Sequence, residues 1–200
     1  EHVATDLSVA FIASVLENCP GAVHVFDHFH VVKLMNDHLD DIRRKVYAME
    51  KDVNKRKVLK GTRYLLLGNG EDIFDQQHKT RLDNALAMNE PLSKAYYLKE
   101  QLREIWSQIS KEKAEAVLDD WVKQARESKI PQLMRMAATL LAHRRGILAW
   151  YDSHVSTGKV EGINNKIKVM KRNAYGFRDD RYFTLRLYAL HDCRITRNVG

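Results

Sequence analysis

The sequence predicts a mainly α-helical protein with one or two short β-strands near its beginning. Three observations lead to this prediction. The 200 residues contain only 3 prolines and 9 glycines, so few positions interrupt helices. From Val31 onward, apolar residues recur at spacings of three and four, the pattern of helices with one buried face. Before that point lie two short apolar stretches with strand character, within residues 1–5 and 22–26.

Residues 1–27 predict a strand, a helix and a second strand. The first strand runs into Asp6, and the second, residues 22–26, runs into Asp27. This order is half of a β-α-β unit, and functional sites collect at the carboxyl ends of such strands. A pair of strands is not stable alone, so we expect the remainder of a sheet to lie upstream of Glu1.

A helical body follows and extends to about residue 150. Its first helix carries a long apolar stripe from Val31 to Val46 and ends near Met49. Further helices are expected at residues 73–88, 91–109, 111–128 and 131–152. The three tryptophans fall on apolar stripes and are expected to pack in the core: Trp106, Trp121 and Trp150.

The C-terminal part combines one acid with a strongly basic helix. Within residues 153–178, Glu161 falls in the first helical turn and Gly176 is a stop signal. Apolar residues at spacings of three and four are expected to face inward: Val160, Ile163, Ile167 and Met170. A final helix is expected from about Asp180 to Ile195. Its inward residues are expected to be Tyr182, Leu185, Tyr188 and Ala189.

The composition favours a nucleic-acid partner. The chain has 33 Lys and Arg against 26 Asp and Glu, a formal net charge of +7, and clustered cations displace counterions from phosphates. No apolar run approaches the length of a membrane span, so no membrane partner is expected. The two cysteines, Cys19 and Cys193, form neither a disulfide framework nor a zinc knuckle, which fits a reducing cytoplasm.

Three acids are candidates for metal-dependent chemistry: Asp6, Asp27 and Glu161. Two divalent cations held by carboxylates activate a water or hydroxyl and stabilise the leaving oxygen in phosphodiester chemistry. Magnesium needs few protein carboxylates, because waters and substrate phosphates complete its shell. Structural interpretations also exist, since Asp6 suits the N-cap of the next helix and Glu161 suits the positive end of a helix dipole.

The segment Asp27-His28-Phe29-His30 allows two interpretations. Together with His24, its histidines could supply ligands to a transition metal, but no cysteine pair accompanies them. The favoured interpretation is that Asp27 and His30 hydrogen-bond to each other or to nearby backbone, and so fix the turn behind the site.

Basic residues after Glu161 are candidates for phosphate contacts, which position DNA without reading its sequence. They are Lys166, Lys168, Lys171, Arg172 and Arg178. The other interpretation is a solvated charged face. A second basic cluster, His143-Arg144-Arg145, either contacts DNA or balances nearby acids, and the sequence leaves both alternatives open.

Three motifs occur in order along the chain: A-T-D-L-S at 4–8, D-H-F-H-V-V-K-L at 27–34, and S-T-G-K-V-E-G-I-N-N-K-I-K-V-M-K-R-N-A-Y-G-F-R at 156–178. Together they resemble the DDE transposases of bacterial insertion sequences, specifically the ISL3 branch, over nearly the whole chain. The resemblance implies a fragment of a ribonuclease-H-like α/β core that carries a large all-α insertion. The expected division is 1–30 for core strands, 31–150 for the insertion and 151–200 for helices that return to the core with the last acid.

The resemblance also implies roles for particular residues. Asp6 corresponds to the second catalytic carboxylate and Glu161 to the third, both as ligands of Mg²⁺ or Mn²⁺, with two ions in the complete enzyme. Asp27 and His30 correspond to a D-x-x-H element after the second acid, and Asn165 is a further supporting residue. The first catalytic Asp is expected upstream, so the chain alone is expected to be inactive.

A competing assignment makes Asp6 and Asp27 the first and second acids. It is disfavoured, because the short connection between them leaves no room for the hairpin strands that normally follow the first acid.

The function implied by the resemblance is metal-dependent cleavage of DNA at insertion-sequence ends and strand transfer into target DNA. The expected setting is a homo-oligomer on DNA in the bacterial cytoplasm. Two other functions stay open at this point. One is a non-catalytic helical module for DNA binding or assembly, and the other is a nuclease that uses the same acids for hydrolysis alone.

Overall fold

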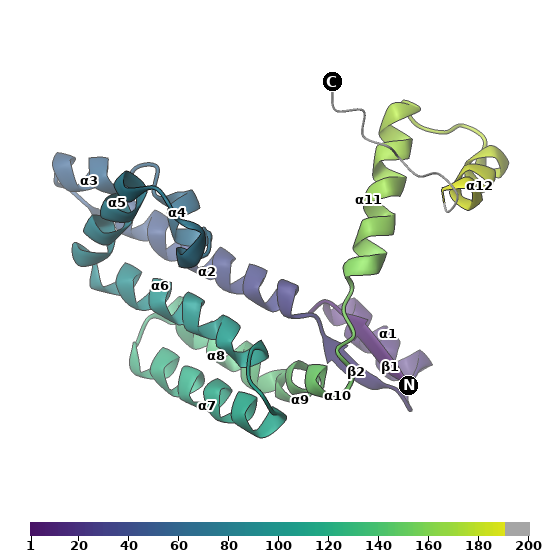
Figure 1. The fold of residues 1–200 in the computed structure, drawn as a ribbon, viewed down its shortest axis with the longest axis horizontal. Helices are drawn as coiled ribbons and strands as arrows, with labels where there is room; N and C mark the ends of the chain where they lie inside the picture. The colour runs from purple at the N-terminus through teal and green to yellow at the C-terminus, as the bar shows by residue number, and fades with distance from the viewer. Residues whose placement is uncertain (191–200) are drawn as a thin grey trace. The chain divides into compact units, whose positions relative to one another are not determined.

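The computed structural model describes residues 1–190 as a mainly α-helical chain with one small parallel sheet (Figure 1). This confirms the predicted fold class with its two short strands. The chain divides into two compact units, Glu1–Ser156 and Thr157–Gly200, and the second is described here up to residue 190. Cys193 and the expected helix end at Ile195 lie outside the described residues.

The first unit opens with the predicted strand, helix and strand. Strand β1 (His2–Thr5) pairs in parallel with β2 (Val23–Phe26), and α1 (Val9–Asn18) connects them. The register places Thr5 opposite Phe26. The backbone N–H of Asp27 donates to the carbonyl of Thr5 at 3.1 Å, so the pairing continues one residue past the end of β2.

Helix α2 (His28–Met49) starts directly after the second strand, three residues before the expected Val31. The reason is a capping bond, in which the Asp27 carboxylate accepts from the backbone N–H of Phe29 at 2.9 Å. The apolar stripe that the sequence predicts is buried in the structure. Its fully or almost fully buried members are Val31, Met35, Leu39 and Ile42.

The remaining elements of the first unit are short helices and two 3-10 turns. They are α3 (Val53–Leu59), α4 (Arg63–Leu67), η1 (Gly70–Asp72), α5 (Gln76–Ala87), α6 (Glu90–Arg103), η2 (Glu104–Trp106), α7 (Lys111–Glu127), α8 (Pro131–Ala142), α9 (Arg144–Leu148) and α10 (Trp150–Ser153).

Three helix boundaries differ from those expected. The helix expected over 131–152 is three helices. His143 leaves helical geometry between α8 and α9, with φ −109° and ψ 11°, and Ala149 stands between α9 and α10. The helix expected from 73 starts at Gln76, since the Asp75 carboxylate caps it by accepting from the N–H of His78 at 2.8 Å. The helix expected to end at 109 ends at Arg103 and continues as η2.

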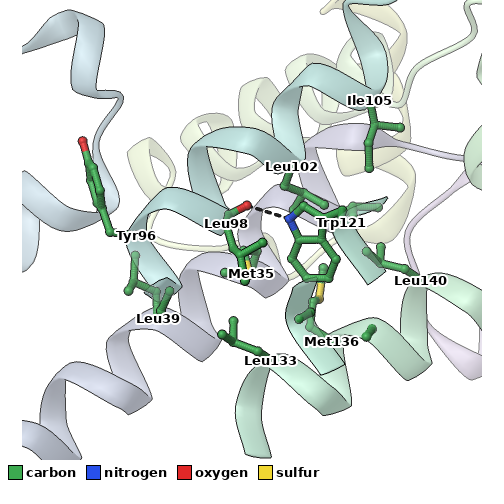
Figure 2. Packing of buried hydrophobic residues seen from close by; sticks show 14 of the residues in the cluster. Met35, Leu39, Tyr96, Leu98, Leu102, Ile105, Trp121, Leu133, Met136 and Leu140 are labelled. Atoms are coloured by element: carbon green, nitrogen blue, oxygen red, sulfur yellow. Dashed lines mark hydrogen bonds between the residues drawn. The ribbon is translucent and has the colours of Figure 1, made fainter. Parts of the chain in front are cut away.

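The core of the first unit is built around Trp121 of α7. Figure 2 shows its indole between buried side chains of α2, α6 and α8. The indole Nε1 donates to the carbonyl of Leu98 at 2.7 Å, which satisfies the only polar atom of this buried ring. Trp106 is also buried, and the half-buried Trp150 packs against the same core, so the expected packing of the tryptophans is confirmed.

A buried lysine ties the turn after α4 to α6. Lys99 is fully buried, and its ammonium donates to the carbonyl of Gly68 at 2.5 Å and pairs with Glu100. The ammonium also lies 4.5 Å from the ring centre of Tyr96. Burial lowers the pKa of Lys99, and burial together with the charge of Glu100 raises the pKa of Tyr96 to about 12.

The sheet joins the helical core through a glycine. A Cβ atom placed on Gly146 of α9 would lie 2.5 Å from Cδ2 of Phe26 and 3.2 Å from the carbonyl oxygen of His24. Phe26 is buried, with the ring centres of His24 and His143 at 4.5 and 4.9 Å. Only a residue without a side chain therefore lets α9 pack directly against β2.

Replacing Gly146 by Ala should destabilise the first unit. The added methyl collides with a ring that is held on both sides, and overpacking of this kind costs about 1–3 kcal/mol. Urea unfolding monitored by circular dichroism measures the loss. Gly21→Ala is the matched control, because a Cβ there meets nothing within 4 Å. Equal stability of both variants would show that α9 does not rest on β2.

The two histidines beside Phe26 make stability depend on pH. Burial lowers the pKa of His24 and of His143, and the charge of His143 lowers that of His24 further. Each therefore binds fewer protons in the folded state than in the unfolded state. The free energy of unfolding should then fall as pH drops below the ordinary value of 6.5, and it should be retained above it.

His143→Gln should flatten that pH dependence, because it removes one of the groups that must lose its proton on folding. Chemical denaturation at several values between about pH 5 and pH 7.5 measures the slope. The difference in the free energy of unfolding between the variant and the unmutated protein near the upper end of this range measures any loss of packing, separately from the slope. An unchanged slope in the variant would contradict this account.

The second unit contains two described helices, α11 (Gly158–Asn173) and α12 (Asp180–Ala189). Met170 is buried and Ile167 half-buried, as expected, but Val160 and Ile163 are 59% and 52% exposed, so that part of the prediction is wrong. A spacing pattern marks the apolar stripe but does not fix how much of it a neighbouring element covers, so Val160 and Ile163 stay largely exposed.

The inward face predicted for α12 is also wrong. Tyr182, Leu185 and Tyr188 are 52%, 60% and 76% exposed, and Ala189 is exposed as well. The half-buried residues are instead Phe183, Leu187 and Leu190. Leu187 and Leu190 line a small pocket together with three residues of α11: Ile163, Lys166 and Ile167. Apolar residues occur on several faces of α12, so periodicity alone could not select the face that meets α11.

Candidate functional site

Two acids stand at the same edge of the sheet. Asp6 follows β1 and Asp27 follows β2, directly after the paired residues Thr5 and Phe26. Because the strands are parallel, both acids lie at carboxyl ends, as the sequence predicts. The bond from the Asp27 N–H to the Thr5 carbonyl, 3.1 Å long, holds the two strand ends together at this position.

Asp6 is half-buried, and one of its carboxylate oxygens is fixed by the backbone. Oδ1 accepts from the N–H of Ser8 at 2.8 Å. The N-cap of α1 is Ser8, so Asp6 supports the turn into the helix but is not its cap. Within residues 1–190 the carboxylate has no other hydrogen-bond or ion-pair partner. One oxygen therefore orients the group, and the other is available for a ligand.

Asp27 differs from Asp6 in burial and in its bonding. It is only 3% exposed, and its Oδ1 caps α2 through the N–H of Phe29. The ring nitrogen Nδ1 of His28 lies 3.6 Å from this oxygen. A buried capping carboxylate suits a supporting role behind the site. The pairing of Asp27 with His30 stays a prediction.

The residue before Asp6 contacts a histidine of the neighbouring strand. The ring nitrogen Nε2 of His24 is 2.6 Å from Oγ1 of Thr5, the residue next to Asp6. The same hydroxyl donates to the backbone carbonyl of Asp6 at 2.8 Å. Sequence analysis did not identify Thr5, because the contact depends on the parallel register, which places residues 19 positions apart on neighbouring strands.

Glu161 lies in the first turn of α11, as expected. The N-cap of this helix is Thr157, and the Glu161 N–H donates to the Thr157 carbonyl at 2.9 Å. At 3.6 residues per turn, positions 161, 165, 168 and 172 fall on one face. The half-buried Glu161 is thus followed along this face by the exposed side chains of Asn165, Lys168 and Arg172.

The five basic residues proposed to contact phosphates are all exposed: Lys166, Lys168, Lys171, Arg172 and Arg178. Among residues 1–190, none of them forms an ion pair with an acid. Lys171 instead places its ammonium 4.7 Å from the ring centre of Phe183. The second unit therefore presents cationic charge that its own described acids leave uncompensated.

The second basic cluster behaves differently. Arg144 donates to Glu115 at 2.9 Å and to Oδ2 of Asp119 at 2.8 Å, and these bonds to α7 raise its pKa. Hydrogen bonding to Arg144 likewise lowers the pKa of Asp119. Of the two alternatives left open for His143-Arg144-Arg145, the structure supports the balancing of acids for Arg144.

Comparison with known proteins decides the family. The family of ISL3-type DDE transposases, described as transposase, matches residues 1–187. The chain belongs to this family. The recognition made from the three motifs is therefore confirmed for most of the chain.

Two relatives illustrate the similarity. The transposase for insertion sequence element IS1001 of Bordetella parapertussis is 38% identical over 189 residues, covering 94% of this chain and 46% of the relative. The transposase for insertion sequence element IS1557 of Mycobacterium tuberculosis is 31% identical over 199 residues, covering 88% of this chain and 44% of the relative. The chain thus spans about half the length of these transposases. No solved structure matches it.

The donor atoms of this ISL3-family chain fit the hard cations on which DDE chemistry relies. Asp6 has a carboxylate oxygen available at a strand end, and Glu161 carries a carboxylate on the same helix face as exposed cations. The two residues belong to different units, so their convergence stays a prediction. Within the described residues, no three His, Cys, Asp or Glu side chains are grouped closely enough to hold a metal ion.

The described part of the transposase chain offers no helix long and apolar enough to span a membrane.

Proposed function

We propose that this chain supplies two of the three catalytic acids of a DDE transposase that cuts DNA at insertion-sequence ends and joins the freed 3′ hydroxyl to target DNA. The observation that carries the proposal is the placement of Asp6. It ends a strand of a parallel sheet, keeps one carboxylate oxygen for a ligand, and lies in a chain of this family. A strand outside the chain would contribute the first acid.

Asp6 and Glu161 would hold Mg²⁺, or Mn²⁺, at this site, with two ions in the complete enzyme. Such ions, when bound, activate the attacking water or hydroxyl and stabilise charge on the leaving oxygen. The N–H of Ser8 would keep the Asp6 carboxylate oriented toward the ions. Asp27 would hold the neighbouring strand end through its cap of α2, and His30 and Asn165 would support the site.

The exposed cations of α11 would bind the DNA backbone next to the acid. Lys168 and Arg172 follow Glu161 along one face, and Lys166, Lys171 and Arg178 extend the charge. Contacts of this kind fix the position of DNA without selecting its sequence. A homo-oligomer would bring two element ends and the target together.

Glu161→Gln in the full-length transposase tests the catalytic role. The amide keeps the size of the side chain but removes the charge that a metal ligand needs. Strand transfer of a labelled DNA end should fall about a hundredfold or more. Binding of the same DNA, measured by fluorescence anisotropy, should stay within about twofold, since phosphate contacts come from the cations.

Glu112→Gln is the matched control, because Glu112 also lies in the first turn of a helix, α7, and its side chain is exposed. It should leave strand transfer unchanged. Normal strand transfer by Glu161→Gln would favour a non-catalytic module for DNA binding or assembly. Products with a cut strand but no joined strand in the unmutated protein would indicate a nuclease.

The double variant Lys168→Ala, Arg172→Ala tests the proposed DNA surface. Each lost phosphate contact should lower the slope of log affinity against log salt by about 1, so the slope should fall by about 2. Titration of duplex DNA at several salt concentrations measures this slope. Lys113→Ala, Lys123→Ala on α7 is the control, since both lysines are exposed. Equal slopes in the two double variants would argue against a DNA surface on α11.

A further inference from the structure

Helix α11 ends in a motif that places a tyrosine where glycine is usual. The N–H of Gly176 donates to the carbonyl of Lys171 at 2.9 Å, and the N–H of Tyr175 donates to that of Arg172 at 3.1 Å. These two bonds define a Schellman motif, whose residue after the C-cap takes a left-handed conformation. That residue is Tyr175, with φ 51°, a region that side chains with a Cβ avoid.

No interaction of the Tyr175 side chain within the described residues offsets this backbone strain. Its relative exposure is 100%, and within residues 1–190 its ring has no aromatic, cationic or hydrogen-bonding partner. The neighbouring aromatic residue behaves differently, since Phe177 packs 5.2 Å from Phe183 between ring centres. The chain thus combines a strained backbone with an exposed ring at one residue, which packing and stability do not explain.

The surroundings of the ring indicate what it would bind. Lys171 and Arg172 lie in the last turn of α11, and Arg178 lies three residues after Tyr175; all three are exposed. An aromatic ring among exposed cations is the combination that binds single-stranded nucleic acid, where bases stack on the ring and the cations hold the backbone. A protein partner that buried this ring would also have to neutralise the positive charge of the same cations.

We infer that Tyr175 stacks on an unpaired nucleobase of the DNA held along α11. This inference rests on the proposed function, because it takes DNA as the partner of the basic helix. It adds a binding residue that contacts a base, whereas the cations contact phosphates. The left-handed backbone would hold the ring beyond the end of the helix, toward a base that has left its pair.

The experiment uses the full-length transposase and a duplex with one bulged 2-aminopurine, next to the same duplex fully paired. Stacking quenches the fluorescence of this base. Tyr175→Gly should remove the quenching and weaken binding of the bulged duplex about tenfold. Affinity for the paired duplex should change little. Tyr175→Phe should behave as the unmutated protein does, because stacking needs the ring and not the hydroxyl.

Thermal unfolding separates this role from a structural one. Glycine fits the left-handed position better than tyrosine, so Tyr175→Gly should melt at an equal or higher temperature while it loses base binding. The control is Tyr188→Ala, since Tyr188 is another exposed tyrosine. Alanine replaces it because glycine would destabilise α12, in which Tyr188 lies. This variant should keep the quenching.

Several outcomes would overturn the inference. Unchanged quenching and affinity in Tyr175→Gly would do so. A lower melting temperature with equal losses on both duplexes would point to a structural residue, and loss of self-association alone would point to a protein contact. Failure here is distinguishable from failure of the proposed function, because Glu161→Gln tests strand transfer independently of any base contact.

Discussion

The parallel pairing of two four-residue strands is the constraint on which the candidate site depends. It alone brings Asp6 beside Asp27, which are 21 positions apart in the chain but follow opposed residues in the register. A two-stranded sheet is not stable by itself in water. Its position here is supported by packing of β2 on α9 and by the cap that joins β2 to α2.

These supports explain how a small sheet can stay ordered beside a large helical body. Gly146 lets α9 approach Phe26, and Asp27 starts α2 without an intervening loop. Helix α2 then runs from the site into the core around Trp121. The helices of the first unit therefore support the strand ends, because the buried stripe and the capping bond belong to one continuous helix, α2.

The distribution of charge separates the two units. In the first unit, several cations pair with acids: Arg144 binds two acids of α7, and the buried Asp40 binds Arg43 and Arg44, each at 2.8 Å. Burial opposes the ionised form of Asp40, but the two arginines outweigh it and lower its pKa. In α11 the exposed cations have no such acidic partners within the described residues. A net positive charge is thus concentrated where DNA binding is proposed.

The sequence by itself determined the family, the mainly helical class, the strand ends at Asp6 and Asp27, and the first-turn position of Glu161. These features follow from local signals, since caps, turns and apolar spacing act over a few residues. Only the tertiary structure decided the break at His143, the partners of Arg144 and the face of α12 that packs. Each of these depends on contacts between elements that are distant in the sequence, and local sequence patterns do not specify such contacts.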